Sequence, residues 1–365
     1  MAANGNKANG AAGTAQRPLL AVTMGDAAGI GPEIIVKALA RLDVLAACRP
    51  LVIGDADIME SHLRFWPREQ GATSVRPAVR RVAAPEEVGD VPWGTIPVLQ
   101  PGAPLASVRP GQLSAEAGRG AVEYVLAAAE LAKAGRVAGI VTAPLNKEAI
   151  HLAGYQFPGH TELLAQAFGV KTFSLVLSAR DMFVFHVTTH VSLRQALDLI
   201  TIPRVLAQIR LAHWLAAALD LSGEPIAVAG VNPHAGEGGL FGTEERDVIE
   251  PAIKQARAEG IPAVGPLPAD VLFPRAARGR YRFVIAMYHD QGHAVFKTLY
   301  FDEGVNVTAG LPVIRTSVDH GTAFDIAGQG VAKEDSLVAA IDLAARLGPK
   351  WPAVYERAKA YEADL

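Results

Sequence analysis

The sequence predicts an α/β fold in which helices cover both faces of a mainly parallel β-sheet. Short runs rich in apolar and β-branched residues alternate with longer segments of helical periodicity along most of the chain. This alternation indicates strand–helix–strand units. The chain has 365 residues, of which 50% are hydrophobic and 19% charged, and this composition is typical of a globular protein with a large core.

Strands are predicted where a short apolar run is bounded by turn residues. In chain order they are Pro18–Met24, Leu51–Gly54, Thr95–Leu99, Gly139–Pro144, Phe173–Ser178, Met182–Thr188, Ile226–Val231 and Phe283–Met287. Helices are predicted where apolar residues recur at a spacing of three to four residues. They are Ile30–Leu39, Ser114–Gly135, Leu193–Leu199, Pro203–Leu219, Glu244–Glu259 and Asp335–Leu347. The turn signal at 179–181 predicts a β-hairpin between the two strands that flank it.

Composition also excludes several classes of protein. Residues 1–17 are rich in Ala, Gly and Asn and lack the apolar core of a signal peptide, so we expect a disordered tail. No stretch approaches the ~20 apolar residues of a membrane helix, and the net charge of −3 argues against a basic nucleic-acid binder. The single cysteine, Cys48, cannot form an internal disulfide. We therefore expect a soluble, cytoplasmic protein that binds neither membranes nor nucleic acid.

Polar segments follow several predicted strands, where ligands gather in parallel sheets. The glycine-rich loop Gly25–Glu33 fits either an anion cradle or a simple turn, because it matches neither the dinucleotide nor the Walker spacing. The segment Thr142–Lys147 fits either a ligand contact or a helix cap. In Pro158–Glu162, Thr161 either caps a helix beside an exposed His160, or both side chains bind an anion together with N–H groups of the helix start.

Three histidines lie just past three predicted strands, namely His190, His234 and His289. Because parallel strands end at the same edge of a sheet, we expect the three to lie on one edge. Neutral imidazole is the commonest protein ligand of catalytic divalent metals, and three ligands leave a position open for substrate. Each histidine taken alone is more often a structural residue, so the metal hypothesis depends on their coincidence.

The densest polar cluster lies near the C-terminus. It comprises Lys297, Asn306, Arg315, Thr316, Ser317, Asp319, His320 and Thr322. Arg315 stands in a run of strand residues, where a permanent charge needs a partner if it is buried. A phosphate or carboxylate would supply that partner through paired hydrogen bonds. The alternative is a structural salt bridge to Asp319 or Asp325.

Taken together, these segments resemble the 4-hydroxythreonine-4-phosphate dehydrogenase family of vitamin B6 biosynthesis. The matching strings run in order from about residue 20 to residue 347. They are MGDAAGIGPE, GQLSAEAGRGAVEY, TAPLNK, PGHTELLA, NPHAGEGGLFGTEE, YHDQG and GLPVIRTSVDHGTAFDIAG. The resemblance implies an α/β/α fold like that of isocitrate and isopropylmalate dehydrogenases, with a cleft between two subdomains. We place the first subdomain at 18–148 plus 321–365 and the second at 149–320.

The resemblance also implies roles for individual residues. The metal ligands would be His190, His234 and His289, holding one divalent ion (Zn, Co, Mg or Mn) between the subunits of a homodimer. Substrate and its phosphate would be bound by His160, Thr161, Lys297, Asn306 and Arg315. The NAD cofactor would lie along Asp319, His320, Gly321, Thr322 and Asp325. The predicted catalytic residues are Lys297 and Asp290, the latter as a proton acceptor or as support for a neighbouring ligand.

The implied reaction is the NAD-dependent oxidation and decarboxylation of a small phosphorylated 3-hydroxy acid. The chain departs from the family pattern at Ala27, where a proline is usual, and at His293, where the biosynthetic enzymes show leucine. A histidine there resembles the branch of the family that oxidises D-threonate or D-erythronate 4-phosphate to dihydroxyacetone phosphate and CO₂. We expect His293 to donate a hydrogen bond to the 2-hydroxyl of such a substrate, which an ammonium group at carbon 2 could not accept.

Two other classes remain open. A phosphate acyltransferase would share the fold but would not need three histidines at strand ends. A non-catalytic binding protein would keep the phosphate-binding residues and lose a metal ligand such as His234.

Overall fold

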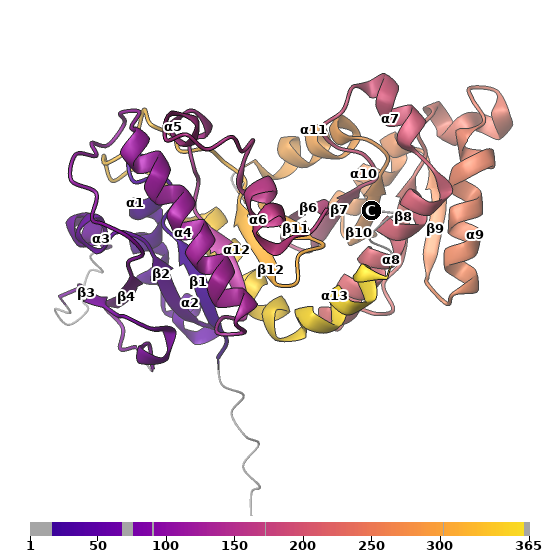
Figure 1. Cartoon of the computed structure of the whole chain (residues 1–365). Helices are drawn as coiled ribbons and strands as arrows, with labels where there is room; N and C mark the ends of the chain where they lie inside the picture. Colours follow the sequence, from indigo (N-terminus) through magenta and orange to yellow (C-terminus); the bar gives the residue numbers. More distant parts are fainter. Residues whose placement is uncertain (1–16, 68–75, 90, 172, 302, 361–365) are drawn as a thin grey trace, which may run out of the picture.

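The computed structural model describes residues 17–67, 76–89, 91–171, 173–301 and 303–360 (Figure 1). The predicted tail, 1–17, lies outside these ranges except for its last residue. None of the helices in the described ranges is long and apolar enough to cross a membrane. The predicted subdomain boundaries at 148/149 and 320/321 stay a prediction.

The described strands form one twelve-stranded sheet in the order β3-β4-β2-β1-β5-β12-β11-β6-β7-β10-β8-β9. The bounds of the first six are β1 Leu19–Thr23, β2 Arg49–Ile53, β3 Ala78–Arg81, β4 Thr95–Leu99, β5 Gly139–Thr142 and β6 Ser174–Ala179. Those of the other six are β7 Met182–His186, β8 Ile226–Ala229, β9 Ala263–Leu267, β10 Phe283–Ala286, β11 Val305–Ala309 and β12 Ile314–Val318.

Helices pack on this sheet along its whole width (Figure 1). In the N-terminal half they are α1 Gly31–Leu39, α2 Leu42–Ala47, α3 Ala56–His62, α4 Ala115–Lys133, α5 Lys147–Leu152 and α6 His160–Phe168. In the C-terminal half they are α7 Leu193–Leu199, α8 Ile202–Ala218, α9 Glu250–Ala258, α10 Ala269–Ala277, α11 His289–Tyr300, α12 Asp335–Leu347 and α13 Trp351–Lys359. The predicted α/β class with a mainly parallel sheet is confirmed.

The direction of the strands reverses in the middle of the sheet. Strands β12 and β5 pair in parallel, whereas β11 pairs antiparallel with both β12 and β6. The predicted hairpin is also present, because β6 and β7 pair antiparallel across a turn in which Arg180 has a φ of 50°. Beyond it, β7, β10, β8 and β9 are again mutually parallel. One sheet thus joins both ends of the molecule through antiparallel strands.

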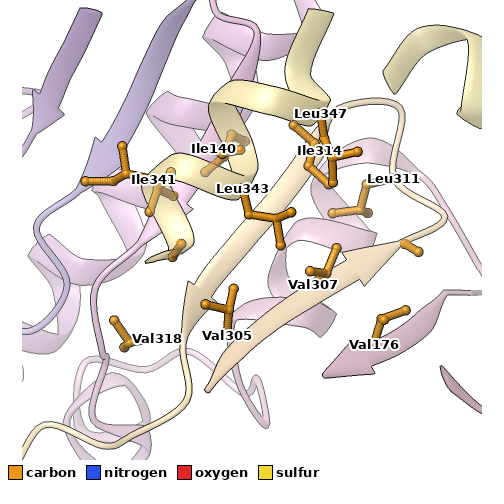
Figure 2. Packing of buried hydrophobic residues seen from close by; sticks show 14 of the residues in the cluster. Ile140, Val176, Val305, Val307, Leu311, Ile314, Val318, Ile341, Leu343 and Leu347 are labelled. Carbon is orange, nitrogen blue, oxygen red and sulfur yellow. The ribbon is translucent and has the colours of Figure 1, made fainter. Parts of the chain in front are cut away.

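Alternation along the central strands separates an apolar face from a polar one. Val305, Val307 and Val318 pack with Leu343 of α12 in the main core (Figure 2), and each such buried side chain stabilises the fold by about 1.5–3 kcal/mol. The intervening positions, Asn306 and Thr308 on β11 and Arg315 and Ser317 on β12, face the other way and are paired across the two strands. This alternation places several polar side chains together on one face of the sheet.

Several elements differ from the prediction for identifiable reasons. The run Met182–Thr188 ends as a strand at His186, so His190 lies in the loop beyond it. The predicted helix Glu244–Glu259 divides into a π-helical turn, Glu245–Ile249, and α9. Strands β3, β9 and β11 were not predicted, because their sequences AVRR, AVGPL and VNVTA are short and contain charged, Gly-Pro or polar residues. Of the polar residues in β11, Asn306 lines a cavity and Thr308 accepts a hydrogen bond from Arg315.

Candidate active site

A cavity of about 580 Å³ lies against the polar face of the central strands. The strands contribute Thr142, Leu175, Asn306, Arg315, Ser317 and Val318 to its lining. The connecting segments and helices contribute Pro144, Leu145, Lys147, Pro158, Gly159, His160, Thr161, Glu162, His190, His293, His320 and Gly321. Four of the five predicted substrate residues therefore line one cavity, the exception being Lys297.

Arg315 lies at the base of this cavity and is only 4% exposed. Its two terminal nitrogens donate to Thr142 Oγ1 at 2.7 Å and to Thr308 Oγ1 at 3.0 Å. Within the described ranges it forms no salt bridge, so the alternative of a structural pairing with Asp319 or Asp325 is wrong, and the Asp319 carboxylate pairs with Lys297 instead. Burial lowers the pKa of Arg315 to about 10, although the charge of nearby Glu162 opposes this effect. A guanidinium buried without a bonded anion is suited to bind an anionic ligand.

Three of the lining residues carry a buried polar atom that has no hydrogen-bond partner within the described part of the chain. These atoms are His160 Nε2, Asn306 Oδ1 and Arg315 Nε. A buried polar atom without a partner costs about 1–3 kcal/mol, so a cluster of three points to a ligand that is bound in the functional state. Burial, followed by the charge of Arg315, holds the pKa of His160 well below its ordinary value. His160 is therefore neutral and can bond a hydroxyl or an anion according to its tautomer.

His160 and Thr161 open helix α6 rather than precede it. The helix begins at His160, and its N-cap is the extended residue Gly159, which offers no side-chain cap. Thr161 is therefore in the first turn and is not the cap considered in the sequence analysis. Both side chains and this uncapped helix start face the cavity.

Lys297 and Asp319 do not line the cavity, but they form a polar group with Asn306, which does. Lys297 Nζ lies 2.7 Å from Asp319 Oδ2 and donates to the Asp319 carbonyl at 2.9 Å. Asn306 Nδ2 donates to Asp319 Oδ1 at 2.8 Å. Asp319 therefore fixes the amide of Asn306 so that its Oδ1 remains available for a ligand.

The strand-end histidines are only partly brought together. Because β7, β10 and β8 are parallel neighbours, His190, His289 and His234 do follow the same edge of the sheet. The rings of His190 and His289 lie 5.6 Å apart, and both line a second cavity of about 430 Å³ with Asp290. His234 instead contacts Phe241, and no group of three His, Cys, Asp or Glu side chains in the described ranges could hold a metal ion.

The loop that carries His234 has an unusual backbone. His234, Ala235 and Glu237 all have positive φ values near 50°, which are rare for residues other than glycine. The buried carboxylate of Glu245 holds the start of this loop by accepting from the N–H groups of Val231 and Asn232, each at 2.7 Å. Strain of this kind persists where the surroundings fix the chain, and it is common at functional sites. This backbone fixes where the His234 side chain lies, which is against Phe241.

Comparison with known proteins places this geometry in a family. The family model described as "Pyridoxal phosphate biosynthetic protein PdxA" matches residues 46–344. The chain belongs to this family. It is 58% identical to D-threonate 4-phosphate dehydrogenase of Bordetella bronchiseptica over 94% of this chain and 96% of that protein. It is 44% identical to 4-hydroxythreonine-4-phosphate dehydrogenase of Desulfosudis oleivorans over 90% and 95%.

Solved structures agree with the family assignment. The crystal structure of 4-hydroxythreonine-4-phosphate dehydrogenase from Klebsiella pneumoniae matches with a TM-score of 0.79 and 45% identity, covering 92% of this chain and 99% of that one. A branched-chain phosphotransacylase from Enterococcus faecalis matches with a TM-score of 0.50 at 10% identity, which shows a shared fold alone. The chain is thus a PdxA-family member, and its relatives are named dehydrogenases.

The predicted cofactor residues of this PdxA-family chain lie in different settings. His320 and Gly321 line the main cavity, whereas Asp319 is bonded to Lys297 as described. Thr322 packs against Gly29, and its carbonyl accepts from Ile30 N–H. Asp325 is exposed, and its carbonyl accepts from the Gln329 side chain. The cofactor role of this stretch stays a prediction.

The glycine-rich loop Gly25–Glu33 packs instead of lining either cavity. All of its residues are buried, and Gly25 approaches the Pro144 carbonyl so closely that a Cβ would lie 2.3 Å from that oxygen. Glu33 accepts from the N–H groups of Gly330 and Ala332 and pairs with Lys37 at 2.8 Å. The loop therefore anchors the segment that follows the predicted cofactor residues, and the simple-turn interpretation fits its packing.

Two residues of the site were missed by the sequence analysis. Thr308 bonds Arg315 from the neighbouring strand, and only recognition of β11 as a strand could have revealed this. Glu162 lines the cavity near Arg315. It lies two residues after His160 in the helix start, and its position in the first turn was the available signal.

Proposed function

We propose that the chain catalyses the NAD-dependent oxidation and decarboxylation of D-threonate 4-phosphate, or of its close analogue D-erythronate 4-phosphate. Hydride leaves carbon 3 for NAD, the 3-hydroxyl loses its proton, and the resulting β-keto acid releases carbon 1 as CO₂. Protonation of carbon 2 then gives dihydroxyacetone phosphate. The observation that carries the proposal is the group of three unpartnered polar atoms at His160, Asn306 and Arg315. The identity to the Bordetella enzyme supports this choice of substrate.

The cavity residues suit the two ends of such a substrate. Arg315 is the buried cation for an anionic group, and a phosphate offers its Nε–H an acceptor. Asn306 Oδ1 accepts from a hydroxyl, because its Nδ2 is already committed to Asp319. His160 supplies one more donor or acceptor. A phosphorylated polyhydroxy acid satisfies all three atoms at once, whereas an apolar acyl group would leave Asn306 and His160 without partners.

A divalent metal would be held by His190, His289 and His234 and would act as a Lewis acid toward the 3-hydroxyl and the keto group that replaces it. Their hydrogen bonds fit that role. His289 Nδ1 lies 2.7 Å from an Asp290 carboxylate oxygen, and His234 Nδ1 lies 3.0 Å from one of Glu237. Carboxylates bonded to Nδ1 in this way leave Nε2 as the ligand atom. This supports Asp290 as a positioning residue rather than the proton acceptor.

The active species is proposed to be a homodimer in which His234 of one subunit completes the metal site of the other. Within the described part of one chain His234 does not join His190 and His289 in a group that could hold a metal ion, and its side chain is 65% exposed. Apolar side chains are exposed beside both parts of the site. They are Val191, Leu193 and Leu197 near His190, and Leu240 and Phe241 near His234. Burial of these two patches against each other would bring the ligands together.

The reaction is tested by mixing purified protein with NAD, a divalent ion and each of three substrates, and by following NADH absorbance. The substrates are D-threonate 4-phosphate, D-erythronate 4-phosphate and 4-hydroxythreonine 4-phosphate. We expect the highest kcat/KM with one of the two 2-hydroxy acids and loss of turnover after chelation. A clear preference for the amino acid phosphate would reverse the choice of substrate. No NADH with any of the three would contradict the reaction itself.

The shared site is tested by mixing two inactive variants, His160→Ala and His234→Ala, after dissociation and reassembly. In the proposed dimer each site takes His160 from one subunit and His234 from the other. A mixed dimer of the two variants therefore has one site with both substitutions and one site with neither. We expect up to about a quarter of the parent activity on statistical grounds. A fully active monomer in sedimentation would contradict the dimer.

A further inference from the structure

His186 is a buried histidine that lines neither cavity. It ends β7 and is 2% exposed. Along β7, Phe183 and Phe185 belong to the main core, while Val184 belongs to the second core cluster with Phe296 of α11. By alternation, His186 faces the same side as Val184 and therefore faces α11. A buried imidazole at this position needs hydrogen-bond partners from its neighbours.

Both of its ring nitrogens have such partners. His186 Nδ1 lies 3.4 Å from the Leu175 carbonyl oxygen, and His186 Nε2 lies 3.1 Å from His293 Nδ1. A carbonyl oxygen can only accept, so Nδ1 of His186 carries the proton and its Nε2 is the acceptor. The proton between the two rings therefore belongs to Nδ1 of His293. It follows that Nε2 of His293 has no proton and presents a lone pair.

The backbone of α11 is shaped to allow this contact. A Cβ on Gly292 would lie 2.2 Å from His186 Nε2, so any larger residue would push the ring of His186 away. The ring of His293 stacks on that of His289 at 3.7 Å, with an angle of 11° between their planes. His293 also lines the main cavity together with Arg315 and His160. The orientation of His293 is thus fixed on two sides, by His186 and by His289.

We propose that His186 is a positioning residue that holds His293 in its Nδ1-protonated tautomer, so that His293 Nε2 accepts a hydrogen bond from the 2-hydroxyl of the substrate. This inference rests on the proposed function for the identity of the substrate, but the tautomer of His293 concerns the protein alone. It differs from the expectation that His293 donates to that hydroxyl. A hydroxyl and an ammonium group can both donate to an acceptor. The lack of a lone pair on the ammonium group therefore does not prevent the amino acid phosphate from bonding to His293.

The consequence for specificity is a different comparison. His293 distinguishes substrates that have a donor at carbon 2 from those that have none, such as 3-hydroxybutanoate carrying a phosphate on carbon 4. Selection between a hydroxyl and an ammonium group then falls to the positive charge of the cavity, to which Arg315 and a bound metal contribute. A site built to bond a polar group rejects an analogue that lacks it, because its own polar atom is left unpaired.

The tautomer is tested directly by nitrogen NMR of histidine-labelled protein, with His293→Leu used to assign the signals of His293. We expect its Nδ1 to be protonated and its Nε2 unprotonated, and we expect this pattern to disappear in His186→Leu. A protonated Nε2 in the parent protein would overturn the proposal. This measurement requires no turnover, so it stands even if every substrate tested fails.

The specificity is tested with three variants and two substrates, D-threonate 4-phosphate and its 2-deoxy analogue. We expect His186→Leu to lower kcat/KM for the 2-hydroxy acid about tenfold and to leave the 2-deoxy acid unchanged. His186→Gln should restore most of the loss, because its amide can donate to Leu175 and accept from His293. The control His213→Leu, on α8 away from both cavities, should change neither value. An equal loss for both substrates, or failure of glutamine to rescue, would overturn the positioning role.

Discussion

Replacement of Arg315 by methionine separates the binding role of this residue from a structural one. Burial lowers its pKa from 12.5 to about 10, and at about 1.4 kcal/mol per pKa unit the buried charge costs about 3–4 kcal/mol. Arg315→Met removes that cost and fills similar space, but it also removes the hydrogen bonds to Thr142 and Thr308. Each hydroxyl left without a partner costs about 1–3 kcal/mol. The opposing effects are of similar size, so we expect little change in the free energy of unfolding.

Binding of a phosphorylated ligand should respond very differently. Truncation of one member of a buried charge pair costs about 2–5 kcal/mol, or roughly 30-fold to several thousandfold in Kd. Calorimetric titration with D-threonate 4-phosphate and with its unphosphorylated parent acid measures this difference. The unphosphorylated acid should bind both proteins alike, and the exposed control Arg180→Met should change nothing. Equal weakening of both ligands, or a variant that unfolds, would refute the argument.

Three further predictions follow from residues outside the phosphate contact. Burial raises the pKa of Asp26 from 3.8 to about 6. The stability that neutral Asp26 contributes is therefore full below pH 3.8 and is lost as the pH rises through 6. In urea titrations Asp26→Asn should raise the free energy of unfolding at pH 7 by up to about 3 kcal/mol. It should also remove the fall in the free energy of unfolding between pH 3.8 and 6. Glu33→Gln should lower it by about 3 kcal/mol, because the half-buried Lys37 loses its charge partner, whereas Glu86→Gln in an exposed pair should have no measurable effect. His234→Ala should abolish divalent-metal binding in calorimetry without lowering the melting temperature, since its side chain is 65% exposed; unchanged affinity would remove it from the metal site.

Much of the site could be anticipated because its residues stand in long, specific motifs. The resemblance selected His160, Asn306 and Arg315, and the structure places all three in one cavity with an unpartnered atom each. The run of strand residues around Arg315 also correctly indicated a strand with a charged residue in it. Local sequence is sufficient to predict such a strand, because successive side chains of a strand point to opposite faces of the sheet.

What the sequence did not reveal depends on contacts between distant segments. The ion pair between Asp319 and Lys297 was not predicted, because Lys297 belongs to a helix that was not predicted. The positive φ values of the loop that carries His234 are one such feature, because the spacing of residues in the sequence carries no information about them. The tautomer of His293 depends on a carbonyl 118 positions earlier, at Leu175, which only the register of the sheet brings near.

The antiparallel strands in the middle of the sheet have a mechanical consequence. Because hydrogen bonds run without a break from β5 through β12, β11 and β6 to β7, the two ends of the molecule are not joined by a loose hinge. If the cavity opens, the sheet must change its twist gradually over all of these strands, which is an elastic deformation. The Arg315–Thr308 contact spans two neighbouring strands and so should keep its length while the sheet twists. The anion-binding base of the cavity would then stay rigid, and the loops that carry His190 and His289 would move instead.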